Sequence, residues 1–354
     1  MKNLYHLSDM TKLIGVLTGG GDCPGLNAVI RAVAKRSLFH GYKVVGFLDG
    51  WQGLIEKRFI DLDHATISGI VHIGGTILGT SRTNVLKNEE TIKQTFQSFA
   101  DLNLHGLVAV GGEGTLTVSH KLSERGMRLV GAPKTIDNDI NVTDFTVGFN
   151  TAVEVATEAI DRLRTTAESH RRVMVVEVMG RHAGWIAAYS GLAGGADAIL
   201  VPEYEMSVEE LQEIIKKRHA RGKQFSIVVV AEGAKLVYQG KDHFIAKDRK
   251  DAFGRPQLGG IGQALSNLLE DNLGIECRVT VLGHTQRGGT PTAWDRVIGT
   301  RLGSAAADLA HQGKWGQMAA FKGNHVEGVP LASAVGNLKT VDKDFWELTR
   351  SFFG

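Results

Sequence analysis

Short apolar runs recur along this chain of 354 residues, and most are followed by a loop rich in glycine or acidic residues. Runs of this length, separated by helical patterns such as residues 26–38, predict parallel strands joined by helices. In the first 140 residues the predicted strands are 13–17, 43–48, 107–110 and 129–132, and the loops are 19–25, 74–82, 111–115 and 133–139. Parallel strands bring their carboxyl ends to one edge of a sheet, where ligands bind in open α/β folds. Four such loops predict a ligand site, because a purely structural explanation needs four separate coincidences.

The first loop, Gly19-Gly20-Gly21-Asp22, lies between a predicted strand and a predicted helix. Free N–H groups and the helix dipole make such a helix N-terminus favourable for phosphate. The spacing matches neither GxGxxG nor the P-loop, so a tight structural turn is the alternative. The second loop ends at Arg82, which we interpret as a phosphate contact, with a surface charge as the alternative.

The third and fourth loops add carboxylates. Glu113 lies among the glycines of residues 111–115, where it would repel phosphate unless a cation lay between them. Mg²⁺ prefers a few carboxylates together with phosphate oxygens, so this loop predicts a magnesium site. Asp137 and Asp139 stand two residues apart beside Thr135 and Lys134, and such a pair can divide the roles of metal ligand and proton acceptor. A polar loop whose side chains bond nearby backbone is the alternative.

Polar side chains also follow predicted strands in the second half of the chain. They are Arg181 after 172–178, Glu232 after 227–231, and His284 with Arg287 after 278–283. With Arg172, this set suits a phosphorylated, hydroxyl-rich substrate, because guanidinium groups bind phosphate bidentately. Each of these residues alone would be read as a surface residue. Residues 235–260 are polar and predict a long surface insertion.

Composition excludes several classes of protein. The 40 basic and 38 acidic residues nearly cancel and form no long basic block, so nucleic acid is not an expected partner. No apolar run approaches the roughly 20 residues that cross a bilayer. Cys23 and Cys277 are too few for a disulfide framework or a cysteine-rich metal site. We expect a cytoplasmic protein that is not bound to a membrane.

The motifs together closely resemble those of the 6-phosphofructokinases, nearly from end to end. The residues that carry the resemblance are 19–22, 111–114, 135–139, 179–181 and 284–289. The resemblance implies an α/β fold of two doubly wound, Rossmann-like domains with mostly parallel sheets and the active site between them. The donor and magnesium domain would comprise residues 1–148 and about 286–336, and the sugar-phosphate domain 149–285 and about 337–354.

The family transfers the γ-phosphoryl group of a donor to the 1-hydroxyl of fructose 6-phosphate, with Mg²⁺. By resemblance, Asp137 is the base that accepts the hydroxyl proton. Asp137, Lys134 and Arg181 form the implied catalytic set. Glu113 and Asp139 are the implied metal ligands. The implied donor-binding residues are Gly21, Arg82, Thr83, Gly112, Glu113, Gly114 and Thr115. The implied sugar-phosphate residues are Thr135, Ile136, Asp137, Arg172, Met179, Gly180, Arg181, Glu232, Arg278, His284, Thr285, Gln286 and Arg287. Most family members carry Asp where this chain has Glu113, so direct metal contact stays open.

Two positions bear on the phosphoryl donor. Glycine at the position of Gly114 is typical of ATP enzymes, whereas lysine at the position of Lys134 is typical of pyrophosphate enzymes. The combination resembles the mixed-substrate group of the family. We favour ATP, because a steric block excludes a ligand more firmly than an added cation attracts another. Pyrophosphate is the alternative donor.

The resemblance also implies a homotetramer in which subunits share substrate sites, Arg172 and Arg278 being the arginines contributed across the interface. Arg31, Arg164, Arg221 and Lys223 match cationic positions of an effector site, whereas Asp197 stands where glutamate is usual, so effector binding stays open.

Two other classes are alternatives: a Rossmann-type dehydrogenase and a non-catalytic relative that binds sugar phosphate. The glycine spacing is wrong for the dehydrogenase. A non-catalytic relative should have lost one of the three acids, and all three are present.

Overall fold

The computed structural model describes residues 12–242, 246–250, 256–258 and 260–354. The contacts divide the chain into two compact units. The first runs up to Lys134 and takes in Arg296–Val335, and the second comprises Thr135–Asp295 and Gly336–Gly354. The observed boundaries thus differ from the expected ones at residues 148 and 286. Residues 135–148 belong to the second unit, where Asp295 accepts hydrogen bonds from the backbone of Gly148 and Thr151, both at 2.8 Å.

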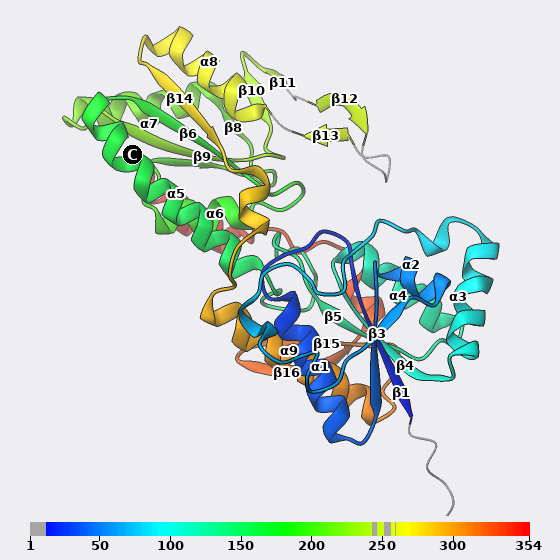
Figure 1. The fold of residues 1–354 in the computed structure, drawn as a ribbon. Coiled ribbons are helices and arrows are strands. Elements are labelled where there is room, and N and C mark those ends of the chain that lie inside the picture. The colour runs from blue at the N-terminus through cyan, green and yellow to red at the C-terminus, as the bar shows by residue number, and fades with distance from the viewer. Residues whose placement is uncertain (1–11, 243–245, 251–255, 259) are drawn as a thin grey trace, which may run out of the picture. The chain divides into compact units, whose positions relative to one another are not determined.

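The first unit is built on a seven-stranded sheet of order β16-β15-β5-β4-β1-β2-β3, with helices on both faces (Figure 1). The strands β1, β2, β4, β5 and β15 run parallel, and β3 and β16 are antiparallel at the two edges. The strand bounds are β1 Leu13–Gly19, β2 Lys43–Phe47, β3 Phe59–Asp61, β4 Leu104–Gly111, β5 Leu129–Pro133, β15 Gln317–Lys322 and β16 His325–Pro330. The helices are α1 Leu26–Phe39, α2 Trp51–Glu56, α3 Glu89–Asp101, α4 Glu113–Glu124 and α10 Leu331–Ala334, with the short 3-10 turns η1 Ile70–His72 and η2 Val85–Lys87. The four strands predicted in the first 140 residues are confirmed.

The core of this unit explains why those runs form strands. The side chains of Leu17, Phe47 and Leu107 are 0% exposed and pack with Leu54 and Leu122 from the covering helices. A strand covered on both faces needs a continuous apolar run rather than an alternating one, as the sequence of β4 shows. The polar loops are therefore confined to the strand ends.

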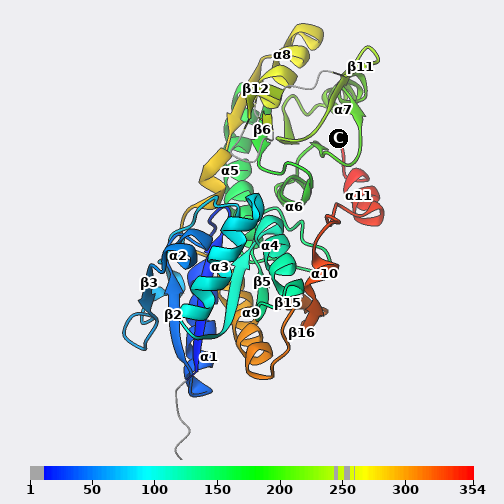
Figure 2. The same cartoon turned by 90° about the vertical axis from the view of Figure 1, so that its right-hand side faces the viewer.

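The second unit is built on a parallel four-stranded sheet of order β14-β6-β9-β7. The helices α5 and α6 lie on one face, and α7 and α8 lie on the other (Figures 1 and 2). The strands are β6 Val173–Val178, β7 Ala198–Leu200, β9 Ser226–Ala231 and β14 Cys277–Val281; the helices are α5 Phe149–His170, α6 Trp185–Ala193, α7 Val208–Ala220, α8 Ile261–Leu273 and α11 Lys343–Arg350, and η3 is Gly283–Arg287. The helix α9, Ala293–His311, spans the boundary between the units. The predicted mostly parallel α/β class is confirmed.

The predicted insertion at 235–260 is only partly described. Residues 243–245, 251–255 and 259 lie outside the described residues. The described part contains β10 Leu236–Tyr238, β11 Lys241–Asp242, β12 Ala246–Lys250 and β13 Pro256–Leu258, and β10 also pairs with β8 Met206–Ser207. Leu236 is 0% exposed in the core, so the start of this segment is not a surface loop.

No helix among the residues described is both long enough and apolar enough to cross a membrane.

Candidate functional site

The glycines at the ends of β1 and β4 leave room for one threonine. A Cβ at Gly19 would lie 2.5 Å from Thr115 Oγ1, and a Cβ at Gly111 would lie 2.4 Å from Thr115 Cβ. Thr115 is therefore packed between the two strand ends and is 7% exposed. The sequence suggested a donor contact for Thr115, whereas the structure gives its side chain a packing position.

The second glycine loop does not follow a strand, which corrects part of the sequence prediction. The strand β2 is followed by α2, and residues 74–82 follow η1 instead. Hydrogen bonds bring the loop to the end of β1: Thr18 Oγ1 lies 3.0 Å from Thr76 Oγ1 and donates to Gly79 O at 2.8 Å, and Thr80 Oγ1 donates to Gly20 O at 2.6 Å. The loop thus reaches the predicted edge through hydroxyl groups rather than through chain connectivity.

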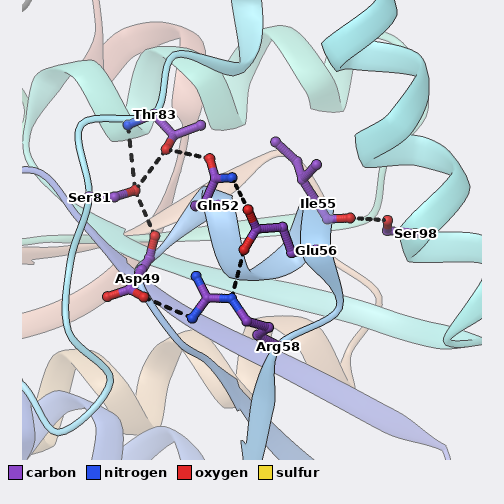
Figure 3. A network of polar contacts seen from close by, with 8 residues as sticks. All are labelled: Asp49, Gln52, Ile55, Glu56, Arg58, Ser81, Thr83 and Ser98. Carbon is purple, nitrogen blue, oxygen red and sulfur yellow. Dashed lines mark hydrogen bonds and ion pairs between the residues drawn. The ribbon is translucent and has the colours of Figure 1, made fainter.

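The end of this loop is fixed on α2 by a chain of polar contacts (Figure 3). Ser81 Oγ donates to Asp49 O at 2.6 Å and lies 3.0 Å from Thr83 Oγ1. Thr83 Oγ1 in turn donates to Gln52 Oε1 at 3.0 Å. Arg82, between them in the chain, is exposed. The anchored neighbours hold the backbone while leaving the guanidinium of Arg82 at the surface, as a ligand contact requires.

Lys134 is buried at the end of β5, with 2% of the residue exposed. Its ammonium donates to Gly19 O at 2.9 Å and to Gly21 O. Its backbone N–H donates to Gly111 O at 2.9 Å. Lys134 therefore ties β5 to the glycine loop after β1 and to the end of β4. The resemblance suggested a role for this lysine toward the donor, and the structure gives it contacts that shape the loop.

The helix α4 begins at Glu113, directly after the extended residue Gly112. Its first-turn N–H groups and dipole favour a bound anion. A Cβ at Gly114 would meet nothing within 4 Å, so the space beside this first turn is open. Glu113 is half-buried, and its carboxylate accepts a hydrogen bond from Thr117 Oγ1 at 3.1 Å.

Burial alternates along the segment that follows β5. Thr135, Asp137 and Asp139 are partly exposed, whereas Ile136 and Asn138 are buried. Asn138 adopts φ 51°, and its side chain accepts from Thr146 N at 3.0 Å and donates to Asp144 O at 3.2 Å. The three predicted polar residues of this loop therefore share its accessible side. Ile136, also predicted to bind substrate, is 0% exposed.

At the carboxyl end of β6, Met179, Gly180 and Arg181 form a turn that only glycine fits. Gly180 adopts φ 135°, and a Cβ there would lie 2.8 Å from Ala183 O. Met179 and Arg181 on either side are partly exposed. The turn therefore presents two predicted sugar-phosphate residues beside an accessible stretch of backbone.

Glu232, at the end of β9, belongs to the same sheet edge. Its pKa is raised from 4.5 to about 7, mainly because burial removes water from the carboxylate and then because of the negative charges of Asp137 and Glu177. Arg287 opposes this shift. An acid with such a pKa can change its charge near neutral pH, a property that is common at functional sites.

The residues after β14 form η3 and divide by exposure. His284 and Thr285 are exposed and Arg287 is partly exposed, as expected of ligand-binding residues. Gln286 is 0% exposed and donates to Gly283 O at 3.1 Å, so its amide shapes the turn. The side chain of Gln286 is therefore internal, and its implied substrate contact stays a prediction.

Arg172 and Arg278 lie away from that edge. Arg172 precedes β6, and its Nε donates to Glu276 Oε2 at 2.6 Å. Arg278 is the second residue of β14 and also pairs with Glu276. A six-residue strand is about 20 Å long, so both arginines lie roughly that far from Arg181. The contribution of both arginines across a subunit interface stays a prediction.

Three of the predicted effector residues in the second unit have partners within the unit. Asp197 is 5% exposed and pairs with Arg218 at 2.9 Å. Arg164 donates to Gly195 O at 2.6 Å, and Arg221 donates to Gly354 O at 3.2 Å. A cavity of about 180 Å³ is lined by Asp197, Arg218 and Gly354 among others. Phe352 and Gly354, near the end of the chain, also line this pocket.

Three polar residues that the sequence did not single out also shape the second unit. Asp295 is 0% exposed and fixes the start of α5. Glu203 accepts from Gly184 N at 2.9 Å and from Val341 N at 2.9 Å, and burial raises its pKa. Lys339 contacts the loop after Asp139. Glu203 closely follows the apolar run of β7, a position that could have identified it. Asp295 and Lys339 lie in helical or loosely patterned sequence.

Comparison with known proteins agrees with this arrangement. Residues 13–310 match the family model described as Phosphofructokinase. The chain is 49% identical over 349 residues to a protein of Dictyoglomus thermophilum named pyrophosphate–fructose 6-phosphate 1-phosphotransferase, covering 97% of this chain and 99% of that protein. It is 52% identical over 329 residues to a protein of Streptomyces coelicolor named ATP-dependent 6-phosphofructokinase 3, covering 93% of this chain and 96% of that protein.

A solved structure shows the same fold. The crystal structure of Pichia pastoris phosphofructokinase in the T-state matches with a TM-score of 0.82 at 30% identity. The match covers 98% of this chain and 37% of the yeast chain.

Proposed function

This chain belongs to the phosphofructokinase family, and on that premise we propose that it transfers the γ-phosphoryl group of ATP to the 1-hydroxyl of fructose 6-phosphate. The products would be ADP and fructose 1,6-bisphosphate. One observation carries the proposal: Thr135, Asp137 and Asp139 share the accessible side of the loop after β5, while the residues between them are buried. Within the loop, Thr135 Oγ1 accepts a hydrogen bond from Asp137 N at 3.2 Å, which helps to fix the backbone that carries the acid.

The proposed chemistry assigns Asp137 as the base that accepts the proton of the 1-hydroxyl. Phosphoryl transfer depends mainly on positioning and on stabilising the charge of the transferred group. Arg181 and Arg287 supply positive charge at the carboxyl edge of the second sheet, where Glu232 can hold a sugar hydroxyl. Arg172 and Arg278 would bind the 6-phosphate of a neighbouring subunit's substrate, with the homotetramer as the proposed assembly.

The proposed donor residues lie on the first unit. Gly21, Gly112 and the first turn of α4 would offer backbone N–H groups to phosphate. The proposed donor set also includes Arg82 and Thr83, whose hydroxyl is anchored on Gln52. The open space beside Gly114 supports ATP, because a nucleotide needs room that a side chain would fill.

Pyrophosphate is the second candidate donor. The relative from Dictyoglomus thermophilum, named for pyrophosphate, and the lysine at position 134 favour it. Against it, the ammonium of Lys134 donates to the carbonyls of Gly19 and Gly21. Its charge therefore already serves the protein's own backbone, which supports ATP as the main donor.

The proposal includes Mg²⁺. The donor set fits, because Glu113 and Asp139 offer hard carboxylate oxygens at partly exposed positions, and Mg²⁺ takes one or two carboxylates with phosphate oxygens and water. Across the described part of the chain, no three or more His, Cys, Asp or Glu side chains form a metal-binding group. When bound, the ion would neutralise charge on the phosphoryl group.

A reaction on two phosphorylated metabolites suits the cytoplasm, and that localisation is part of the proposal.

A coupled assay for fructose 1,6-bisphosphate, together with calorimetric binding of fructose 6-phosphate, tests the proposal. Activity with ATP and Mg²⁺ supports it. Binding of fructose 6-phosphate without turnover with either donor would identify a non-catalytic relative instead.

A further inference from the structure

The turn after the proposed catalytic acid is strained. Val142 adopts φ 60° within residues 139–144, which directly follow Asp137 and Asn138. A β-branched side chain is a true outlier at positive φ. Such a conformation persists only where the surrounding structure holds it, and strain of this kind concentrates at functional sites. The residues that hold this turn therefore bear on the position of Asp137.

One residue from the far end of the chain makes three hydrogen bonds to this turn. The ammonium of Lys339 donates to Thr143 O at 2.9 Å and to Asp144 O at 2.7 Å. Its backbone N–H donates to Asp139 O at 2.9 Å. Beside it, Leu338 forms an antiparallel bridge with Ile140. The two carbonyls that receive the charge lie directly after Val142, so the ammonium holds the strained end of the turn.

The other side of the same segment is bound to the start of α6. Trp185 Nε1 donates to Lys339 O at 3.0 Å, and the Lys339 ammonium lies 5.5 Å from the centroid of the Trp185 ring. Two residues on, Val341 N donates to Glu203, whose carboxylate also accepts from Gly184 N at 2.9 Å. Gly184 ends the turn that carries Met179–Arg181. Figure 2 shows α11, which follows this segment, beside α6.

We propose that Lys339 is a positioning residue for the phosphoryl transfer, holding the Asp137–Asp144 loop in a fixed relation to the Met179–Gly184 loop within the second unit. The inference rests on the proposed function, since it assigns Asp137 to the base and Arg181 to the sugar phosphate. A single ammonium suits this role because its three donors can serve two carbonyls at once. A misplacement of about 1 Å in such a loop can cost about a hundredfold in rate.

The experiment compares Lys339→Met with Lys339→Arg and with Lys343→Met. Lys343 is a matched control: it lies four residues further on, its side chain is 77% exposed, and its partner Glu347 is 3.6 Å away. For each protein, amide hydrogen exchange is followed in residues 139–144, and kcat and the KM for fructose 6-phosphate are measured.

We expect Lys339→Met to speed exchange in residues 139–144 by about tenfold or more, because local opening becomes easier. Its kcat should fall by about tenfold or more while KM changes less than about threefold, since substrate contacts remain. Lys339→Arg should recover most of kcat, because guanidinium also donates to two carbonyls. Lys343→Met should match the wild type in every measurement.

If residues 139–144 of Lys339→Met exchange at the same rate as in the wild type, the proposal is overturned. A fall in kcat without faster exchange in these residues overturns it as well. If Lys339→Met does not fold, Lys339→Gln is measured in the same way and judged by the same outcomes. The exchange measurement needs no catalysis. An inactive wild type therefore overturns the proposed function, while exchange still decides whether Lys339 holds the loop.

Discussion

The ammonium of Lys134 lies 2.9 Å from the carbonyl oxygen of Gly19 and donates a hydrogen bond to it. The two residues are more than a hundred positions apart, and each stands at the carboxyl end of a strand, Lys134 after β5 and Gly19 in β1. The same ammonium also bonds Gly21 O. The lysine that the resemblance associates with pyrophosphate as donor thus fixes, in this chain, the glycine loop proposed to bind the donor.

Removing that ammonium should loosen the glycine loop. Lys134→Met removes the charged donor from the carbonyls of Gly21 and of the buried Gly19, a loss worth about 1–3 kcal/mol. We expect the free energy of unfolding to fall by about this amount and the KM for ATP to rise, as measured by urea unfolding and initial rates. Lys121→Met is the control, because Lys121 is half-exposed on α4 of the same unit. If Lys134→Met keeps the wild-type free energy of unfolding and the wild-type KM for ATP, then the ammonium of Lys134 does not hold the glycine loop in place.

Substitutions at Gly114 should change activity with the donor without changing the stability of the fold. A Cβ at Gly114 meets nothing within 4 Å, so Gly114→Ala and Gly114→Asp are both expected to fold normally. The carboxylate of Gly114→Asp adds bulk and negative charge beside the proposed phosphates, and kcat/KM for ATP should fall by about a hundredfold. Gly114→Ala should lose far less. Equal losses in the two variants would count against the proposed nucleotide position.

Replacing the proposed base should affect turnover more than binding. Asp137→Asn keeps the size of the side chain but removes its ability to accept the hydroxyl proton. We expect kcat to fall by about a hundredfold or more, with the affinity for fructose 6-phosphate nearly unchanged. Calorimetry and initial rates check the two parts separately. A variant that keeps most of its turnover would remove Asp137 from the role of base.

Glu232 should make stability depend on pH in a defined direction. Its pKa is about 7 in the folded protein against 4.5 ordinarily, mainly because of burial. The folded state therefore holds the proton to higher pH, so this stabilising contribution is complete below pH 4.5 and is lost as the pH rises through about 7. Glu232→Gln, which stays neutral, should gain stability relative to the wild type between about pH 5 and about pH 8.

Thermal unfolding of both proteins across that range checks this prediction. The difference in Tm, variant minus wild type, should grow with pH. A constant difference, or one that grows as the pH falls, would contradict the assigned pKa shift of Glu232.

The sequence predicted the strands with continuous apolar runs well, because burial on both faces leaves a signal in every residue. β1, β4 and β5 and their loops are examples. The strands β15 and β16 were not predicted: β16 is an edge strand with mostly exposed residues and carries no comparable run. The unit boundary after Lys134 was also misplaced, since it depends on contacts such as Thr146 Oγ1 to Thr135 O at 2.7 Å.

The candidate site could be predicted as residue types but not as contacts. Asp137 and Asp139 were identified from their spacing, and the structure adds that they share the accessible side of one loop. Thr115 and Gln286 were predicted to bind ligands, yet packing places both side chains in the interior. Lys339 gave no signal, because its partners lie almost two hundred residues earlier in the chain. Contacts of that range leave no periodic pattern in sequence.

The rate of fructose 1,6-bisphosphate formation from fructose 6-phosphate and Mg²⁺, measured with ATP and with pyrophosphate at matched concentrations, tests the proposed reaction and its donor together. We expect turnover with ATP to exceed turnover with pyrophosphate. Faster turnover with pyrophosphate would contradict the donor assignment, and no product with either donor would contradict the proposed reaction itself.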